Sequence, residues 1–143
     1  MHVVEWRQKK GTAVMSKLVM IIDDSLTVRK IMETTLKREG FASVSYPDGI
    51  EALRALNEHR HPVPDLVILD IGLPKMDGYE VARHLKTKQQ FGNTTIVMFS
   101  KRDGVIDRLK GRLVGAKDYI TKPFRTQDVM SVVHSHLSSH SIS

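Results

Sequence analysis

Cysteine is absent from this 143-residue chain, which excludes disulfide bridges and thiolate metal sites and favours a reducing compartment. No apolar run reaches the roughly 18–20 residues that a membrane-spanning helix needs. The segment before the first predicted strand also lacks an apolar stretch of signal-peptide length. Aromatic residues are sparse at 6%, whereas 41% of the chain is hydrophobic and 27% is charged. These features indicate one globular domain, and we expect a cytoplasmic protein without membrane insertion.

Acidic residues are outnumbered, 16 against 22 lysines and arginines, which gives a formal net charge of +6. A basic chain is compatible with nucleic-acid binding. The cations are scattered, however, and no helix-turn-helix, zinc-finger or RNA-binding signature accompanies them. The seven histidines also lack the paired helical spacing of a zinc site. We therefore expect no direct nucleic-acid contact, and the basicity favours an acidic protein partner.

Short apolar or alternating segments follow one another with segments of helical spacing between them. The predicted strands lie at about Leu18–Ile22, Ala42–Tyr46, Leu66–Leu69, Thr95–Phe99 and Asp118–Ile120. The first predicted helix begins after the N-cap Ser25 and stops at Gly40, and the others cover about Ile50–His59, Tyr79–Lys88, Val105–Leu113 and Thr126–Leu137. This alternation predicts a parallel sheet covered on both faces and joined by right-handed crossovers.

Apolar periodicity also predicts which side of each helix is buried. The expected buried sets are Val28, Ile31, Met32 and Leu36 in the first helix, Ile50, Leu53 and Leu56 in the second, and Val129, Val132, Val133 and Leu137 in the last. The Ser/His-rich end of the chain, residues 134–143, is expected to fray.

Polar side chains stand where the predicted strands end. Asp23 and Asp24 follow the first strand, Asp70 the third, Ser100 the fourth and Lys122 the fifth. In an open parallel sheet these ends share one edge, where ligands bind. Carboxylates gathered there repel one another by roughly a few kcal/mol per close pair. A hard divalent cation such as Mg²⁺ or a raised carboxyl pKa would relieve this repulsion.

The same residue types suit phosphoryl transfer. A carboxylate such as that of Asp70 can act as a nucleophile and form an aspartyl-phosphate, while Lys122 and Ser100 can bind phosphoryl oxygens. The alternative is a surface salt-bridge network of little energetic value. Placement of all five residues at successive strand ends favours the chemical interpretation.

The pattern resembles the response-regulator receiver family typified by the chemotaxis regulator CheY. The resemblance is carried by Ile22–Ser25, by Asp70 with Leu73–Gly78, by Ser100, and by Tyr119–Phe124, and it covers about Lys17–Leu137. It implies a flavodoxin-like (βα)5 three-layer sandwich whose five-stranded parallel sheet has the order 2-1-3-4-5. Residues 17–138 would form the receiver domain, between an N-terminal extension, 1–16, and a C-terminal tail, 139–143.

The resemblance implies a role for each site residue. Asp70 matches the phosphoacceptor, and Lys122 matches the phosphate-pairing lysine, joined to Pro123 by a cis bond. Asp24 matches the acid that contacts Mg²⁺ directly and Asp23 the one that acts largely through water. The backbone carbonyl of Gly72 matches the third protein ligand of the metal.

Ser100 and Tyr119 match the family's hydroxyl and aromatic switch pair. Phosphorylation would draw Ser100 and Lys122 toward the new oxygens and bias the surface formed by the fourth helix, the fifth strand and the last helix. Glycines 104, 111 and 115 weaken that fourth helix. A half-buried strand aromatic is the other interpretation of Tyr119, and spacing leaves it open.

We therefore expect a stand-alone response regulator of a two-component phosphorelay, which is not an enzyme beyond promoting its own phosphorylation and dephosphorylation. A histidine kinase or phosphotransfer protein would donate the phosphoryl group, and a downstream effector protein would read the switched surface. The stretches 100–104 and 110–115 are similar to regulators of pilus-type (PilG-like) chemosensory systems, which implies a role in motility or taxis.

Three rival classes fit less well. A phosphatase of the haloacid dehalogenase type needs a second acid two residues after its nucleophile, where this chain has Gly72. A flavodoxin-like electron carrier needs a phosphate-binding loop rich in small residues where Asp23 and Asp24 stand. A degenerate receiver acting only as a scaffold would not need all five chemical positions filled.

Overall fold

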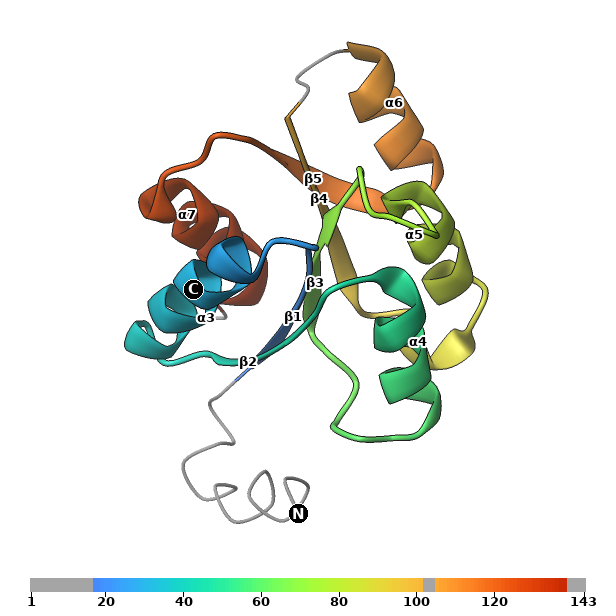
Figure 1. Ribbon diagram of the computed structural model, residues 1–143, viewed down its shortest axis with the longest axis horizontal. Helices are drawn as coiled ribbons and strands as arrows, with labels where there is room; N and C mark the ends of the chain where they lie inside the picture. Colours follow the sequence, from blue (N-terminus) through green and yellow to red (C-terminus); the bar gives the residue numbers. More distant parts are fainter. Residues whose placement is uncertain (1–16, 102–104, 139–143) are drawn as a thin grey trace.

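The computed structural model describes residues 17–101 and 105–138 (Figure 1). Its centre is a five-stranded parallel sheet of order β2-β1-β3-β4-β5, so the predicted flavodoxin-like fold and strand order are confirmed. The strands are β1 (Leu18–Ile22), β2 (Ala42–Tyr46), β3 (Leu66–Asp70), β4 (Thr95–Ser100) and β5 (Ala116–Thr121). β1 and β3 are buried along their whole length, as their continuous apolar runs require.

Helices cover both faces of this sheet (Figure 1). They are α3 (Leu26–Arg38) and α7 (Thr126–Leu137) on one face, and α4 (Gly49–Asn57), α5 (Gly78–Lys86) and α6 (Val105–Leu113) on the other. Successive strand residues point to opposite faces, so Val19 and Ile21 pack toward α3 and α7 while Met20 and Ile22 pack toward α4 and α5. The result is a three-layer sandwich with two apolar cores.

Side chains at the helix starts explain the helix boundaries. The Ser25 hydroxyl accepts from the Val28 N–H at 3.2 Å, and Asp48 accepts from Glu51 at 2.8 Å. Asp77 and Glu80 form a reciprocal capping box at the start of α5. α6 and α7 occupy the predicted residues, whereas α4 and α5 end two residues before the predicted limits.

Several predictions about burial are wrong. Ile31 and Ile50 are exposed, at 41% and 39%, and α4 instead buries Ala52 and Ala55 together with Leu56. Small side chains let this helix lie close to the sheet. In α7, Met130 is buried, while Val132 and Leu137 are only partly so.

The end of the chain differs from its prediction too. His134 and His136 belong to α7 and contact Glu39 and Asp118, at 3.2 Å and 3.0 Å, so this part of the segment expected to fray is ordered helix. β5 is longer than predicted, and a 3-10 helix, η1 (Gln89–Phe91), was not foreseen. The predicted extension 1–16 and tail 139–143 lie outside the described residues. Across the part of the chain that is described, no helix has the length and apolarity needed to cross a membrane.

A substitution of Gly78 would test how closely the start of α5 packs against the end of β3. A Cβ at this position would lie 2.5 Å from the Asp70 carbonyl oxygen and 2.9 Å from the Ile71 Cα, and both are backbone atoms. We expect Gly78→Ala to lower the free energy of unfolding by about 1–3 kcal/mol in urea denaturation, because backbone must shift. Gly111→Ala is the matched control. Its Cβ would meet only side-chain atoms, at 3.4 Å and beyond, so it should leave stability unchanged or raise it by up to about 1 kcal/mol. Equal losses in both variants would contradict this account.

Candidate functional site

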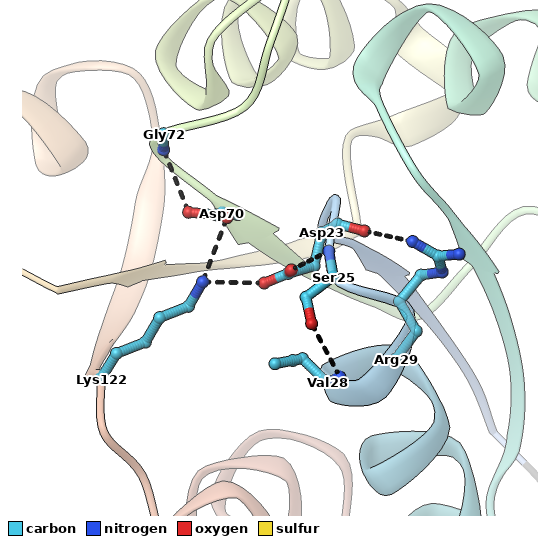
Figure 2. Close-up of polar contacts among 7 residues, drawn as sticks. All are labelled: Asp23, Ser25, Val28, Arg29, Asp70, Gly72 and Lys122. Carbon is cyan, nitrogen blue, oxygen red and sulfur yellow. Dashed lines mark hydrogen bonds and ion pairs between the residues drawn. The ribbon is translucent and has the colours of Figure 1, made fainter.

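Strand ends bring the predicted acids together at the carboxyl edge of the sheet (Figure 2). Asp70 is the last residue of β3 and is 6% exposed, and Asp23 directly follows β1 and is fully buried. Asp24 lies beside them and is exposed. Ser100, the last residue of β4, is 8% exposed. The structure therefore places all four residues at one rim, as the strand-end pattern predicted.

Lys122 connects the two buried acids. Its ammonium lies 3.0 Å from Asp23 Oδ2 and 3.1 Å from Asp70 Oδ2 (Figure 2). The Lys122 backbone N–H donates to the Ser100 carbonyl at 2.7 Å, which ties the residue after β5 to the end of β4. Its peptide bond to Pro123 is cis, as the resemblance implies. One cation thus holds together carboxylates that are 47 residues apart in the chain.

Backbone donors fix the remaining carboxylate oxygens. Ser25 N–H donates to Asp23 Oδ1 at 2.8 Å, and Gly72 N–H donates to Asp70 Oδ1 at 3.0 Å. The Arg29 guanidinium also donates to the Asp23 carbonyl at 2.7 Å (Figure 2). Arg29 has no signature in the sequence pattern, since it acts on backbone from the first turns of α3. These bonds orient both carboxylates before any ligand arrives.

Burial sets the electrostatics of the pair. It raises the pKa of the Asp70 carboxyl above its ordinary value, and the Asp23 charge adds to this effect, while the Gly72 N–H and Lys122 only partly oppose it. Burial also disfavours the charged form of Lys122, but the hydrogen bond to Asp23 and the two carboxylate charges outweigh it. The pKa of Lys122 is therefore raised. The single Lys122 ammonium therefore does not fully compensate the two negative charges of Asp23 and Asp70.

The acidic cluster fits a divalent cation. Asp23, Asp24 and Asp70 each offer a carboxylate oxygen within 4.8 Å of the others. Gly72, whose carbonyl was predicted as a further ligand, lines the cavity next to Asp70. Hard oxygen donors at this spacing suit Mg²⁺, and a second cation would relieve the repulsion that Lys122 leaves.

A cavity of about 480 Å³ opens from Asp70 toward α6. Its lining also includes residues that the strand-end pattern did not predict: Tyr79, Lys101, Asp107 and Lys110. The Tyr79 hydroxyl donates to Asp107 at 3.4 Å, and burial followed by the Asp107 charge raises the pKa of Tyr79 to about 12. Tyr79 and Asp107 are 28 residues apart, so no local motif indicates the contact.

The predicted switch pair occupies two neighbouring strands. Ser100 ends β4 and lines the cavity with Asp70 and Lys122. Tyr119 lies in β5, half-buried against the core, and the Arg108 guanidinium of α6 is 4.8 Å from its ring centroid. Tyr119 is thus a half-buried aromatic residue of a strand, which was the other interpretation of this residue, and it also contacts α6.

The chain matches the response regulator receiver domain model over residues 19–134. It belongs to the response-regulator receiver family. It is 36% identical to Protein PilG of Pseudomonas aeruginosa over 121 residues, which are 85% of this chain and 87% of PilG. Among solved structures, chemotaxis protein CheY4 of Vibrio cholerae is 26% identical with a TM-score of 0.78, over 85% of this receiver and 99% of CheY4. The DrrB receiver domain of Thermotoga maritima shares the fold at 24% identity and a TM-score of 0.75, over 85% and 97% of the two chains.

Membership places this receiver in two-component signalling, where such domains act as signalling proteins rather than as ordinary enzymes. Receivers bind Mg²⁺ at an acidic pocket, and the cluster of three aspartates is the corresponding feature here. The family also implies a kinase partner and an effector.

The buried pair gives a stability prediction. Asp70→Asn leaves the Lys122 ammonium with one buried carboxylate, so at about pH 7 without divalent cations we expect a higher Tm than for wild type. A gain of about 1 kcal/mol corresponds to roughly 4 °C for a domain of this size. Because the folded-state pKa of Asp70 is raised, its favourable contribution to stability is fully present below the unfolded value of 3.8 and is lost as the pH rises through the folded value. The Tm difference should therefore be small near about pH 4 and grow toward about pH 7.

Mg²⁺ provides the control for that measurement. It should raise the Tm of wild type more than that of Asp70→Asn, because the variant lacks one of the charges that bind the cation. A variant that melts below wild type at about pH 7 would contradict the proposed charge imbalance.

Proposed function

We propose that this receiver accepts a phosphoryl group on Asp70 from a histidine kinase or phosphotransfer protein and thereby switches the face formed by α6, β5 and α7. The observation that carries the proposal is the Lys122 ammonium held between two buried carboxylates beside a third acid. In this arrangement the Lys122 ammonium can pair with an incoming phosphoryl group, and the Asp70 carboxylate is oriented to attack its phosphorus atom.

The transfer follows from the positions of the donors. One Asp70 carboxylate oxygen attacks phosphorus, the bond from phosphorus to the donor's imidazole nitrogen breaks, and that nitrogen keeps the electron pair and takes up a proton. Lys122 exchanges its contact with Asp70 for one with a phosphoryl oxygen. The Ser100 hydroxyl, at the same rim, donates to another oxygen, and the Gly72 N–H remains near Asp70.

Asp23, Asp24 and Asp70, with the Gly72 carbonyl, are the groups that would hold Mg²⁺. When bound, the ion supplies neutralisation of the charge that develops on the phosphoryl oxygens. Asp24 is the exposed member and therefore the one most accessible to a direct contact, whereas Asp23 already accepts bonds from Lys122 and Ser25.

Phosphorylation adds about −1.5 to −2 charges at the rim. Movement of Ser100 toward this charge vacates space beside β5, and rotation of the Tyr119 ring into that space changes its contact with Arg108 of α6. The chemical event at Asp70 thereby reaches an outer surface through residues at the ends of β4 and β5.

The similarity to PilG and CheY4 supports a role in motility or taxis. We place the receiver unit at residues 17–138, between an extension, 1–16, and a tail, 139–143, and we expect it to act in the cytoplasm on a protein effector.

Covalent labelling tests the phosphoacceptor directly. Incubation with Mg²⁺ and acetyl phosphate should add one phosphoryl group to wild type, detected by intact mass, and none to Asp70→Asn, because the Asp70 carboxylate lines the cavity beside Lys122 and is oriented by the Gly72 N–H. Asp118→Asn is the matched control, since its carboxylate lies on β5 and pairs with His136 at 3.0 Å, away from the site. It should be labelled like wild type. An unlabelled wild type, or a labelled Asp70→Asn, would refute the assignment.

A substitution of Lys122 should separate the labelling of Asp70 from the conformational response to it. Lys122→Ala should still acquire label or bind beryllofluoride, because Asp70 and the acidic cluster remain. The backbone amide shifts that beryllofluoride causes in α6 and β5 of wild type should be absent, since the ammonium no longer follows the phosphoryl oxygens. NMR of the two proteins with Mg²⁺ and beryllofluoride measures this. Wild-type-like shifts in the variant would count against the coupling through Lys122.

A further inference from the structure

The ends of four neighbouring strands direct their side chains to the same face of the sheet. They belong to β1, β3, β4 and β5 and carry Asp23, Asp70, Phe99 and Lys122. Strand residues two positions apart share a face, and the residues two positions before these four all pack into the core beneath α3 and α7. Asp70 and Phe99 are also direct partners in the register of β3 and β4. The sheet therefore sets an aromatic ring beside two acids and a cation.

The Lys122 ammonium lies over this ring, 4.6 Å from the Phe99 centroid. Its other contacts are the carboxylates of Asp23 and Asp70 (Figure 2). The face of an aromatic ring carries partial negative charge and attracts a cation, more strongly where water is excluded. Phe99 is fully buried, and only 17% of the Lys122 side chain is exposed. Phe99 is thus an uncharged partner of the ammonium in a site whose other groups are ionic.

A second aromatic residue fixes the orientation of the ring. Phe124 meets Phe99 edge to face, with 5.2 Å between the ring centroids and 72° between the ring planes. This is a favoured arrangement of two aromatic rings. Phe99 belongs to the core beneath α3 and α7, and Phe124 packs against that core. Apolar packing therefore holds the ring face toward Lys122, independently of the carboxylates.

The acids and the ring differ in how a divalent cation would affect their hold on Lys122. Asp23 and Asp70 belong to the acidic cluster that suits Mg²⁺, so their oxygens would be shared between the lysine and the metal. A divalent cation would also repel the ammonium. Phe99 offers no oxygen ligand to a hard cation. Its attraction for Lys122 would therefore persist when the hold of the carboxylates weakens.

We propose that Phe99 is a positioning residue, whose ring face keeps the Lys122 ammonium at the rim while a divalent cation occupies the acidic cluster. The ring acts through the lysine and contacts no ligand itself. This inference deepens the proposed function and rests on it for its purpose. An ammonium that had moved into solvent would have to return before it could pair with a phosphoryl oxygen, so the response would fall with the fraction of molecules in which Lys122 is in place.

The alternative is that Phe99 only fills the core. Trifluorophenylalanine at position 99 separates the two roles, because the fluorine atoms withdraw electron density from the ring face and change the ring volume little. The cation–π attraction would weaken, while the packing against Phe124 would remain. A residue that only fills space would therefore tolerate this replacement.

Proton NMR of the Lys122 side chain in the full chain tests the proposal. In wild type the protons on Lys122 Cε should resonate upfield, because they lie near the ring face, and Mg²⁺ should leave this shift in place. In the protein with trifluorophenylalanine at position 99, Mg²⁺ should remove at least about half of the shift. Mg²⁺ should bind this protein at least as tightly as wild type, since a looser ammonium repels it less. General damage to the rim would weaken Mg²⁺ binding instead.

Two further variants serve as controls. Phe99→Leu should lack the upfield shift with and without Mg²⁺, which assigns the shift to this ring. Trifluorophenylalanine at position 91 is the matched control, because Phe91 is 2% exposed but lies in the core on the other face of the sheet. It should behave like wild type.

Beryllofluoride connects the ring to the response. With Mg²⁺ and beryllofluoride, the amide shifts in α6 and β5 should reach at most about half of their wild-type size in the protein with trifluorophenylalanine at position 99. Acetyl phosphate should still label it like wild type, because Asp70 and the acidic cluster are unchanged.

Several results would overturn the role of Phe99 without bearing on Asp70 as the phosphoacceptor. These are no upfield shift in wild type, its loss from wild type on addition of Mg²⁺, its retention in Phe99→Leu, equal retention in wild type and in the protein fluorinated at position 99, weaker Mg²⁺ binding by that protein, and equal effects of fluorination at positions 91 and 99. The expected Mg²⁺ effects in a wild type that neither takes label nor responds to beryllofluoride would instead support the hold of the ring on Lys122 and count against the proposed function.

Discussion

The arrangement of this receiver depends on one ammonium between two carboxylates. Lys122 joins Asp23 and Asp70 across the carboxyl edge of the sheet, and all three groups are largely withdrawn from water. In such surroundings a charge imbalance costs far more than it would at the surface. The parallel sheet holds the two carboxylates close together, so their excess negative charge over the single Lys122 ammonium persists. The site therefore favours a ligand that supplies positive charge or one whose oxygens accept hydrogen bonds from Lys122.

Most of the fold and the acidic site could be predicted because each depends on local sequence. Continuous apolar runs identified β1, β3 and β4, and the N-cap Ser25 fixed the start of α3. Once a parallel sheet is accepted, polar residues that end its strands must meet at one edge. Asp23, Asp70, Ser100 and Lys122 needed no further information to be brought together. The strand order itself came from resemblance to the receiver family.

The features that were missed depend on contacts between distant segments. Helical periodicity predicted that Ile50 is buried, but α4 packs against the sheet through its alanines. A periodic pattern does not indicate how closely a helix approaches the sheet. His134 was expected in a fraying end, yet it meets Glu39, 95 residues away. Tyr79 and Asp107 likewise meet across the cavity. The composition of a segment carries no information about which distant segment packs against it, and these contacts depend on that packing.

The acidic site and α6 differ in how firmly the rest of the structure holds them, and the switch that we propose depends on this difference. Asp23, Asp70 and Lys122 are fixed by hydrogen bonds to one another and to the backbone. α6, in contrast, buries only Gly111 and keeps its large apolar residues outside. Its displacement would sacrifice little packing. Under the proposed phosphorylation of Asp70, the charge added at the acidic site would therefore be accommodated most readily by a displacement of α6.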